Sequence, residues 1–559
     1  MKSLPFFCLL PGLFMLEPAA ASATDLLENS LRSLQVTAGV DHQNVYDINH
    51  DGTIGLEDAV YGLHLVASGG PLPVATPTLR FNLPGSWDED WFASTAVYDL
   101  DSDGNMEIIG SRHSVTYVWN HLGTLKWSAP VGQNGSPSST IIHGSARQYA
   151  SPVVGDLDGD GKGEIAIAYS NKIAIYEDNG NLKSGWPQSF PNSTNEIRSI
   201  AATDLDGDNK KELLAVKTSS GPVTMVWNSN GSGRTGWPQV QNCASCTDFG
   251  GYNQNIGAAD LTGDQVPEII STYDCSHIGF NYADGSPLPA NAVFAGSYIS
   301  SVPMFHDLAL AIQGWGPDLN DRDEFTDSPP VFTDLDRDGK AEVIVYSDHE
   351  KAGEYINRGN CLWVLNEDLT RSPGFETPLC SGEPIFTGYE NNIVQVAPAP
   401  ALADLTGDPR LEIIVPSYDG YMRAYSADGA LLWSYQFDAP GATFNGASGA
   451  AAGDLNDDGI PEIVFSTYST TDNVSHLIVL DAWGQVLHKI ALLKRGSMSV
   501  PTLADIDGDD TLEIIVSLKD RIDYTYGGVQ VYDVPTARRG YQPWPTGRGN
   551  LDRDGQPAM

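Results

Sequence analysis

A nine-residue acidic motif occurs eight times along this chain, and its repetition narrows the range of folds. In the copy DLDGDGKGE, carboxylates stand at positions 1, 3, 5 and 9, and an apolar run follows directly. Successive copies start 48 to 74 residues apart. Repeats with a period near about 50 residues are typical of solenoids, propellers and other arrays. The sequence therefore predicts one structural unit repeated eight times.

The composition of the motif indicates a metal site. Four carboxylates in one tight turn repel one another unless a counter-charge lies between them. Side chains at positions 1, 3 and 5 of such a turn converge on one point, and a residue with positive φ at position 6 makes the reversal. All the ligands are hard oxygen atoms, which favours Ca²⁺ over zinc or copper. A solvated acidic loop is the alternative for a single copy, and the eightfold repetition disfavours it.

The eight loops are not expected to bind metal equally well. We expect the copies from Asp260 and Asp404 to bind metal most weakly, because Thr262 and Thr406 supply a weaker oxygen at position 3. Pro409 also stands where a positive φ is needed, which proline cannot adopt. The candidate calcium ligands of the eight loops are Asp99, Asp101, Asp103, Glu107, Asp156, Asp158, Asp160, Glu164, Asp204, Asp206, Asp208, Glu212, Asp260, Thr262, Asp264, Glu268, Asp334, Asp336, Asp338, Glu342, Asp404, Thr406, Asp408, Glu412, Asp454, Asn456, Asp458, Glu462, Asp505, Asp507, Asp509 and Glu513.

The flanks of the motif repeat as well and predict an all-β fold. A short run of small residues precedes each loop, and an apolar run such as IAIAY, typical of a strand buried on both faces, follows it. Hairpins with NG or DG turns come next, as in IAIYEDNGNLKSGW. A four-stranded unit repeated eight times predicts an eight-bladed β-propeller. Trp119, Trp127, Trp227 and Trp433 are expected mainly as core between the blades.

The stretch SPVVGDLDGDGKGEIAIA resembles the FG-GAP or VCBS repeat, which is found in the propeller of integrin α chains and in many bacterial secreted proteins. The resemblance extends over roughly residues 90 to 535 and concerns the calcium-loop half of the repeat. Integrin propellers have seven blades, so seven is the alternative count. Some eight-bladed calcium-rich propellers of this general kind are rhamnogalacturonan lyases. GWPQ, at Gly185 and Gly236, and PWPTGRGN, at Pro543, also look like bacterial members of this family.

The first 70 residues predict export and a small calcium module. Residues 1–23 have the basic start, apolar stretch and Ala-Ser-Ala end of a secretory signal peptide. Residues 24–70 contain one EF-hand-type loop followed by an amphipathic helix, and they resemble half of a type I dockerin. This resemblance implies a cohesin-like partner, and a generic calcium-binding helical appendage is the alternative. The candidate ligands of this loop are Asp47, Asn49, Asp51, Thr53 and Asp58.

The remaining boundaries follow from composition. Residues 71–77 are expected as a linker, 78–550 as the propeller and 551–559 as a tail. The net charge of −41 argues against nucleic acid as a partner. The apolar stretch of the signal peptide is too short to span a membrane, and no transmembrane segment is predicted elsewhere.

The cysteines fit an oxidising compartment. Cys361 and Cys380 are expected to form one disulfide bond, and Cys275 is expected to pair with Cys243 or Cys246. Residues 286–326, between the fourth and fifth loops, form an extra insertion rich in aromatic side chains. The insertion is interpreted as a ligand platform or as an inert excursion.

These observations predict a secreted or cell-surface calcium-binding propeller that binds an extracellular glycan or protein. The alternative is a polysaccharide-active enzyme such as a lyase, or a component of polysaccharide catabolism docked through the dockerin-like module. Motifs of metalloproteases, serine hydrolases and phosphate loops do not occur in the sequence. The sequence leaves any catalytic residues unknown.

The ring is expected to close by pairing distant parts of the chain. The stretch TLRFNLP, residues 78–84, resembles an outer strand but precedes the first loop and has no blade of its own. It is expected to complete the last blade, for which GYQPWP near Tyr541 competes.

Overall fold

The computed structural model describes residues 73–85, 90–130, 147–219, 221–239, 250–314, 323–348, 359–382, 399–407, 410–439, 445–469 and 475–558. The signal peptide, the dockerin-like module with its five candidate ligands, and Asp408 lie outside these residues and stay predictions. Pro73–Met559 forms one compact unit. In the described part of the chain, no helix is both long and apolar enough to cross a membrane.

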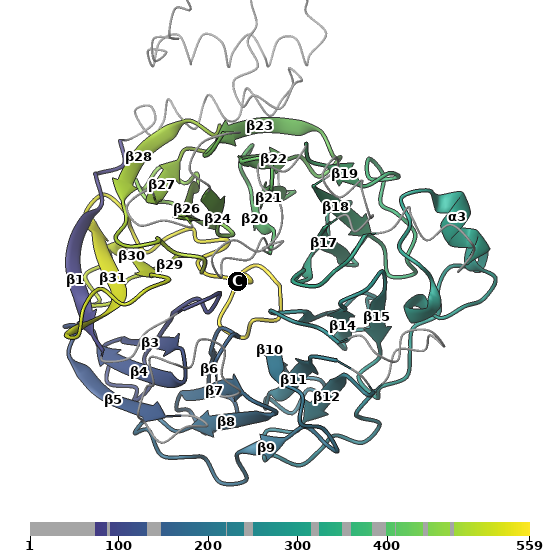
Figure 1. The fold of residues 1–559 in the computed structure, drawn as a ribbon, viewed down its shortest axis with the longest axis horizontal. Helices are drawn as coiled ribbons and strands as arrows, with labels where there is room; N and C mark the ends of the chain where they lie inside the picture. Colours follow the sequence, from purple (N-terminus) through teal and green to yellow (C-terminus); the bar gives the residue numbers. More distant parts are fainter. Residues whose placement is uncertain are drawn as a thin grey trace, which may run out of the picture. The chain divides into compact units, whose positions relative to one another are not determined.

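Eight antiparallel sheets stand around a central axis, as the sequence predicts (Figure 1). We number the blades 1 to 8 in chain order and give their strands from the axis outward. Blades 1 to 4 are β2 (Ala96–Tyr98), β3 (Glu107–Arg112), β4 (Val115–Asn120), β5 (Leu125–Pro130); β6 (Val153–Gly155), β7 (Glu164–Tyr169), β8 (Lys172–Tyr176), β9 (Gln188–Ser189); β10 (Ile197–Thr203), β11 (Glu212–Lys217), β12 (Thr224–Trp227); and β13 (Ile256–Ala259), β14 (Glu268–Thr272), β15 (Ile278–Asn281).

Blades 5 to 8 continue the same order. Blade 7 has two short inner strands that pair with the same neighbour. These blades are β16 (Val331–Thr333), β17 (Glu342–Asp348), β18 (Asn360–Leu365), β19 (Leu379–Cys380); β20 (Ala401–Ala403), β21 (Glu412–Pro416), β22 (Tyr421–Tyr425), β23 (Leu431–Gln436); β24 (Asn445–Ala447) with β25 (Ala451–Gly453), β26 (Glu462–Ser469), β27 (His476–Leu480), β28 (Val486–Ala491); and β29 (Thr502–Ala504), β30 (Leu512–Ser517), β31 (Tyr526–Val534), β1 (Thr78–Pro84).

The predicted ring closure is confirmed. Strand β1 pairs antiparallel with β31 and so completes blade 8 with residues from the other end of the compact unit. In the register, Leu79 stands opposite Tyr532 and Asn82 opposite Gln530. The competing stretch near Tyr541 instead forms an isolated bridge between Trp544 and Ala452 of blade 7. Ring closure therefore rests on one pair of strands that are distant in sequence.

Tryptophans of the outermost segments join neighbouring blades. The indole Nε1 of Trp186 in blade 2 donates to the carbonyl of Ser229 in blade 3, and Trp237 in blade 3 donates to Ala283 in blade 4. Trp127 and Trp433 make the same contact to Asp178 and Ala482. The expectation that Trp127 and Trp433 lie between blades is confirmed.

The GWPQ motif belongs to this junction. Gly185 has a φ of +91°, and a Cβ added there would lie 2.3 Å from the carbonyl oxygen of Asn230 in the next blade. Gly236 repeats this close approach with a φ of +93° against Asp284. Glycine is therefore needed before each tryptophan so that the next blade can pack against the chain.

The insertion after the fourth loop packs into the core. It contains the 3₁₀ turns η1 (Ala292–Phe294) and η2 (Ile299–Ser301) and the short helix α3 (Leu308–Gln313). Phe294, Phe305 and Phe325 are buried in the same cluster as Trp363 of blade 5. Residues 315–322 of the insertion lie outside the described part.

The disulfide between Cys361 and Cys380 is confirmed. Its two cysteines face each other in the register of β18 and β19. Cys275 is buried, and its predicted partners Cys243 and Cys246 lie outside the described residues.

Closure by β1 can be tested with two leucines of the same strand. Leu83 is fully buried, whereas Leu79 is 47% exposed. We expect Leu83→Ala to lower the free energy of unfolding by about 2–5 kcal/mol, because it leaves a cavity in the core. Leu79→Ala should change it by less than about 0.5 kcal/mol. Both values come from denaturant unfolding. Equal, small effects of the two variants would contradict closure through β1.

Candidate metal centres and the axial pocket

The acidic loops share one backbone geometry. Each joins the inner strand of a blade to the second strand. The residue at position 4 has a positive φ in all eight loops, from Ser102 to Gly508, and position 6 has one in the seven loops where it is described. Asn209, Gln265 and Asp510 hold this conformation at position 6 without being glycine. The predicted reversal at position 6 is thus present in these seven loops.

The first aspartate of each loop caps the turn. In blade 2, the carboxylate of Asp156 accepts hydrogen bonds from the backbone N–H groups of Gly159, Asp160 and Gly161 at 2.8–3.0 Å. The aspartate at position 5, Asp160, accepts from the N–H of Lys162. These bonds orient the carboxylates inward and leave oxygen atoms available for a cation.

A buried glutamate closes every loop. Glu164 begins β7 and accepts a hydrogen bond from the N–H of Leu157 at position 2 of its loop. The same bond recurs in all eight loops, and each glutamate is at most 4% exposed. Burial raises the pKa of Glu164 to about 7 and that of Glu513 to about 8, because desolvation disfavours the charged form. Positive charge nearby is needed to keep these side chains ionised.

The oxygen positions fit a divalent cation. In the loops of blades 1, 2, 3 and 5, one carboxylate oxygen from each of positions 1, 3 and 9 lies within 4.8 Å of the others. Two oxygens bound to one Ca²⁺ at about 2.4 Å are at most about 4.8 Å apart. Oδ1 of Asp101, Asp158 and Asp507, all at position 3, is buried without a hydrogen-bond partner. The acidic clusters therefore have the spacing and free acceptor atoms that a metal ion requires.

In four loops, a lysine or arginine reaches the same carboxylates. Nζ of Lys183, just before β9, lies 2.7 Å from Asp158 and 3.1 Å from Glu164. Lys126, Arg234 and Arg80 occupy the equivalent outer position of blades 1, 3 and 8 and pair with positions 3 and 9 of their loops. The ion pairs raise the pKa of Lys183, so its ammonium remains charged.

Four blades have no lysine or arginine at this outer position, and in three of them the residue at position 3 of the loop is neutral. Leu288, Leu432 and Leu487 stand at the outer position of blades 4, 6 and 7. In these blades Thr262, Thr406 and Asn456 donate hydrogen bonds to Oε1 of Glu268, Glu412 and Glu462 at 3.0–3.3 Å. The threonines that the sequence indicated as weak metal ligands thus have a direct structural partner.

Blade 5 departs from both patterns. Its loop has Asp336 at position 3, but Ser372 takes the outer position. Among the described residues, no lysine or arginine forms an ion pair with Asp336 or Glu342. Burial, together with the three aspartates of the loop, raises the pKa of Glu342 to about 7. Among the described residues, this loop is the one that has an aspartate at position 3 without an ion-paired lysine or arginine.

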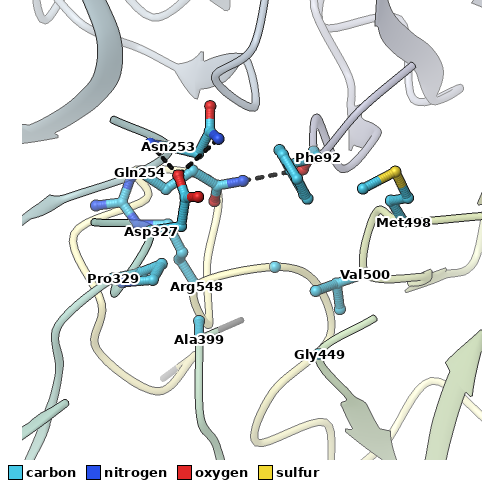
Figure 2. Close-up of a pocket in the computed structure, with 11 residues that line it drawn as sticks. Phe92, Asn253, Gln254, Asp327, Pro329, Ala399, Gly449, Met498, Val500 and Arg548 are labelled. Carbon is cyan, nitrogen blue, oxygen red and sulfur yellow. Dashed lines mark hydrogen bonds between the residues drawn. The ribbon is translucent and has the colours of Figure 1, made fainter. Parts of the chain in front are cut away.

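An axial pocket lies at the other end of the inner strands. Phe92, Gln254, Asp327 and Met498 line it, and each precedes the inner strand of its blade. The acidic loops follow those strands, so the pocket and the loops lie on opposite rims, which we call the pocket rim and the loop rim. Figure 2 shows Asp327 accepting from Asn253, and Gln254 donating to the carbonyl of Phe92. The cavity volume is about 30 Å³.

Aromatic rings and cations form a layer near this pocket. Trp91, Phe92, Tyr149, Tyr468 and Met498 pack together. Nζ of Lys519 lies 3.7 Å from the centre of the Trp91 ring, and the guanidinium of Arg198 lies 4.0 Å from that of Tyr149. Burial raises the pKa of both Asp90 and Asp327 to about 6. No sequence pattern predicts this cluster, because its members come from the ends of several separate blades.

Comparison with known families supports the repeat. The sequence model described as "FG-GAP-like repeat" matches residues 99–167, 156–215 and 204–271. The chain therefore carries FG-GAP-like repeats on an eight-bladed β-propeller. No curated protein matches the sequence.

Several solved structures resemble the chain at low sequence identity. The biofilm matrix protein Bap1 of V. cholerae is 15% identical, covers 86% of this chain and 97% of its own, and gives a TM-score of 0.38. A quinohemoprotein alcohol dehydrogenase from Pseudomonas putida is 12% identical, and the match covers 85% of this chain and 78% of that protein, with a TM-score of 0.45. BamB from Moraxella catarrhalis is 13% identical, and the match covers 83% of this chain and 100% of that protein, with a TM-score of 0.41.

The link between position 3 and the outer cation can be tested in blade 2. In chelator, we expect Lys183→Leu to lower the free energy of unfolding by about 2–4 kcal/mol, because it leaves Asp158 and the buried Glu164 without their cation. Adding Asp158→Asn recreates the leucine and asparagine of blade 7 and should recover most of the loss. Urea unfolding of the single and double variants measures both effects.

Lys162→Leu is the matched control in the same blade. Its ammonium lies 3.7 Å from Asp178, and the lysine side chain is 55% exposed. Such exposed pairs contribute about 0–1 kcal/mol. The interpretation is wrong if the double variant is as unstable as Lys183→Leu alone.

Proposed function

We propose that this protein is a calcium-stabilised propeller that acts outside the cell by binding a glycan or a protein. The observation that carries the proposal is the set of eight carboxylate loops on one rim, with unpartnered oxygen atoms and glutamates of raised pKa. The chemistry of the oxygen donors favours Ca²⁺. Metal in these loops would stabilise the scaffold, while the opposite rim remains available for a ligand.

The pocket rim is the better candidate for the binding face. The inner strands begin there, so each connection from one blade to the next reaches its new blade at this rim. Loops carried by a rigid scaffold are the usual place for binding residues. At this rim the partly exposed guanidinium of Arg198, which lies over the Tyr149 ring, is a side-chain type common in interface hot spots. The predicted export signal and the high negative charge accord with a role outside the cell.

Calcium dependence is the first test. At a dissociation constant of about 10⁻⁴ M and about 1 mM free calcium, each occupied site adds about 1.4 kcal/mol to the free energy of unfolding. We expect chelation to lower the melting temperature strongly, and millimolar Mg²⁺ to restore little of it, because Mg²⁺ requires a tighter octahedral shell. Differential scanning calorimetry in chelator, calcium and magnesium measures this. The same melting temperature in chelator and in calcium would contradict the presence of structural metal sites.

Blade 5 supplies a sharper comparison. Because Asp336 has no lysine or arginine, Ca²⁺ is the cation expected to balance its loop. Asp336→Asn should therefore reduce the calcium-induced rise in melting temperature more than Asp158→Asn, since Lys183 already neutralises part of the charge in blade 2. A larger reduction by Asp158→Asn would contradict this ranking.

Ligand binding is the second test. A glycan array probed with the labelled, calcium-loaded protein should give bound glycans without product release. We expect Gln254→Ala and Asp327→Asn on the pocket rim to weaken that binding about tenfold, whereas Asp404→Asn on the loop rim leaves it unchanged. If unsaturated sugar products accumulate on incubation with pectin fractions, the protein is a lyase and the binding proposal fails. If no glycan on the array binds, the proposal predicts adhesion to a protein instead. Attachment of beads coated with this protein to cell surfaces then measures it.

A further inference from the structure

The segment Tyr541–Ala558, which we call the axial segment, lies along the axis of the ring (Figure 1, yellow). It leaves blade 8 after the exposed residues Arg538–Gly540 and visits the inner strands in blade order. Its carbonyl oxygens accept hydrogen bonds from the N–H groups of Asp454, Ala452, Leu503, Val154, Ala202, Ala258 and Phe332 at 2.7–3.1 Å. The segment then closes on itself, because the N–H of Ala558 donates to the carbonyl of Pro543.

Two arginines of the segment donate hydrogen bonds to main-chain carbonyls at the inner strands. The guanidinium of Arg553 donates to the carbonyls of Thr95 in blade 1 and Pro152 in blade 2 at 3.0 and 3.2 Å. That of Arg548 donates to the carbonyls of Ile200 in blade 3 and Ile256 in blade 4. Each guanidinium thus bridges two adjacent blades. Both side chains are at most 1% exposed.

These contacts select for arginine. A planar guanidinium presents five N–H donors in a fixed fork, which a compact lysine ammonium does not reproduce. The acceptors are main-chain carbonyls, which the ring presents whatever its own side chains are. Burial lowers the pKa of both arginines to about 9, so they remain charged at neutral pH.

Glycines let the segment approach this closely. A Cβ added to Gly555 would lie 2.5 Å from the carbonyl oxygen of Pro330 in blade 5, and one on Gly549 would lie 2.0 Å from that of Gln556 within the segment itself. Both glycines have a positive φ. The sequence GRGNLDRDG is therefore matched to the channel through its arginines and its glycines.

The blades are complete without the axial segment. Every sheet has its own inner and outer strands or bridges, and β1 and β31 close the ring. Among the described residues, the segment adds the partly buried Leu551 to an apolar cluster of the blades and buries Trp544, which is 1% exposed. It also makes hydrogen bonds to main-chain groups, as a peptide bound along a strand edge does, and its Asp552 forms an ion pair with Lys211 of blade 3 at 2.5 Å.

We propose that the axial channel is a peptide-binding site specific for two arginines spaced as in GRGNLDRDG, and that the axial segment occupies it as an exchangeable ligand of the ring. The same peptide supplied by a second copy of this chain fits the site equally well. This proposal does not depend on calcium. The segment contributes Gly547 and Arg548 to the lining of the axial pocket.

The test uses the full chain with a protease site inserted between Gly540 and Tyr541. After folding and cleavage in calcium, a fluorescent peptide of residues 541–558 is added, and its binding is followed by anisotropy. We expect the labelled peptide to exchange into the cleaved protein and to be excluded from the uncleaved protein. In competition, peptides with Arg548→Gln or Arg553→Gln should bind at least tenfold more weakly than the unchanged peptide.

A peptide with Pro557→Ala is the matched control and should compete as well as the unchanged one, because no described hydrogen bond involves the Pro557 ring. The proposal is overturned if the arginine variants compete equally well, or if the cleaved protein keeps its original segment without exchange. It is also overturned if cleavage alone unfolds the ring, since the segment would then be an integral part of the fold.

Discussion

The buried glutamate that closes each acidic loop sets the chemistry of the rest of the blade. Its carboxylate ties the loop to the start of the second strand by accepting the N–H of position 2. A buried carboxylate needs hydrogen bonds or positive charge, because desolvation disfavours its ionised form. The chain supplies these in different ways. Four blades bring in a lysine or arginine from the outer position of the blade, three place a neutral donor at position 3, and blade 5 offers neither.

The blades are then joined by contacts that repeat from one to the next. The indole of one blade donates to a turn carbonyl of its neighbour, and the preceding glycine permits the close approach. Such contacts fix the rotation between sheets and leave the two rims chemically different. The loop rim carries the carboxylates, whereas the pocket rim carries aromatic rings and cations. The proposed function assigns structural ions to the loop rim and a ligand to the pocket rim.

The sequence could predict the elements that depend on local pattern. The eight loops, the buried second strands, the hairpins and the disulfide between Cys361 and Cys380 each follow from spacing or from adjacent strands. Closure by residues 78–84 was predictable because that stretch looks like an outer strand without a blade. The pairing of Lys183 with Asp158 was not, since it depends on strand register across the sheet. Reading position 3 beside the outer position in all eight repeats would have revealed it.

The axial segment was the least predictable part, for a physical reason. Its residues follow neither a helical nor a strand period, because they contact a ring of strand edges one group at a time. A propeller leaves the inner edge of every sheet with unpaired N–H and C=O groups. Here carbonyls of the segment satisfy the donors, and the guanidiniums of Arg548 and Arg553 satisfy acceptors. Each neutral hydrogen bond contributes only about 0.5–1.5 kcal/mol net, and those to charged groups about 1.5–3 kcal/mol. The segment is therefore held by the number of its contacts and by its two arginines, and the glycines around them are as necessary as the charges.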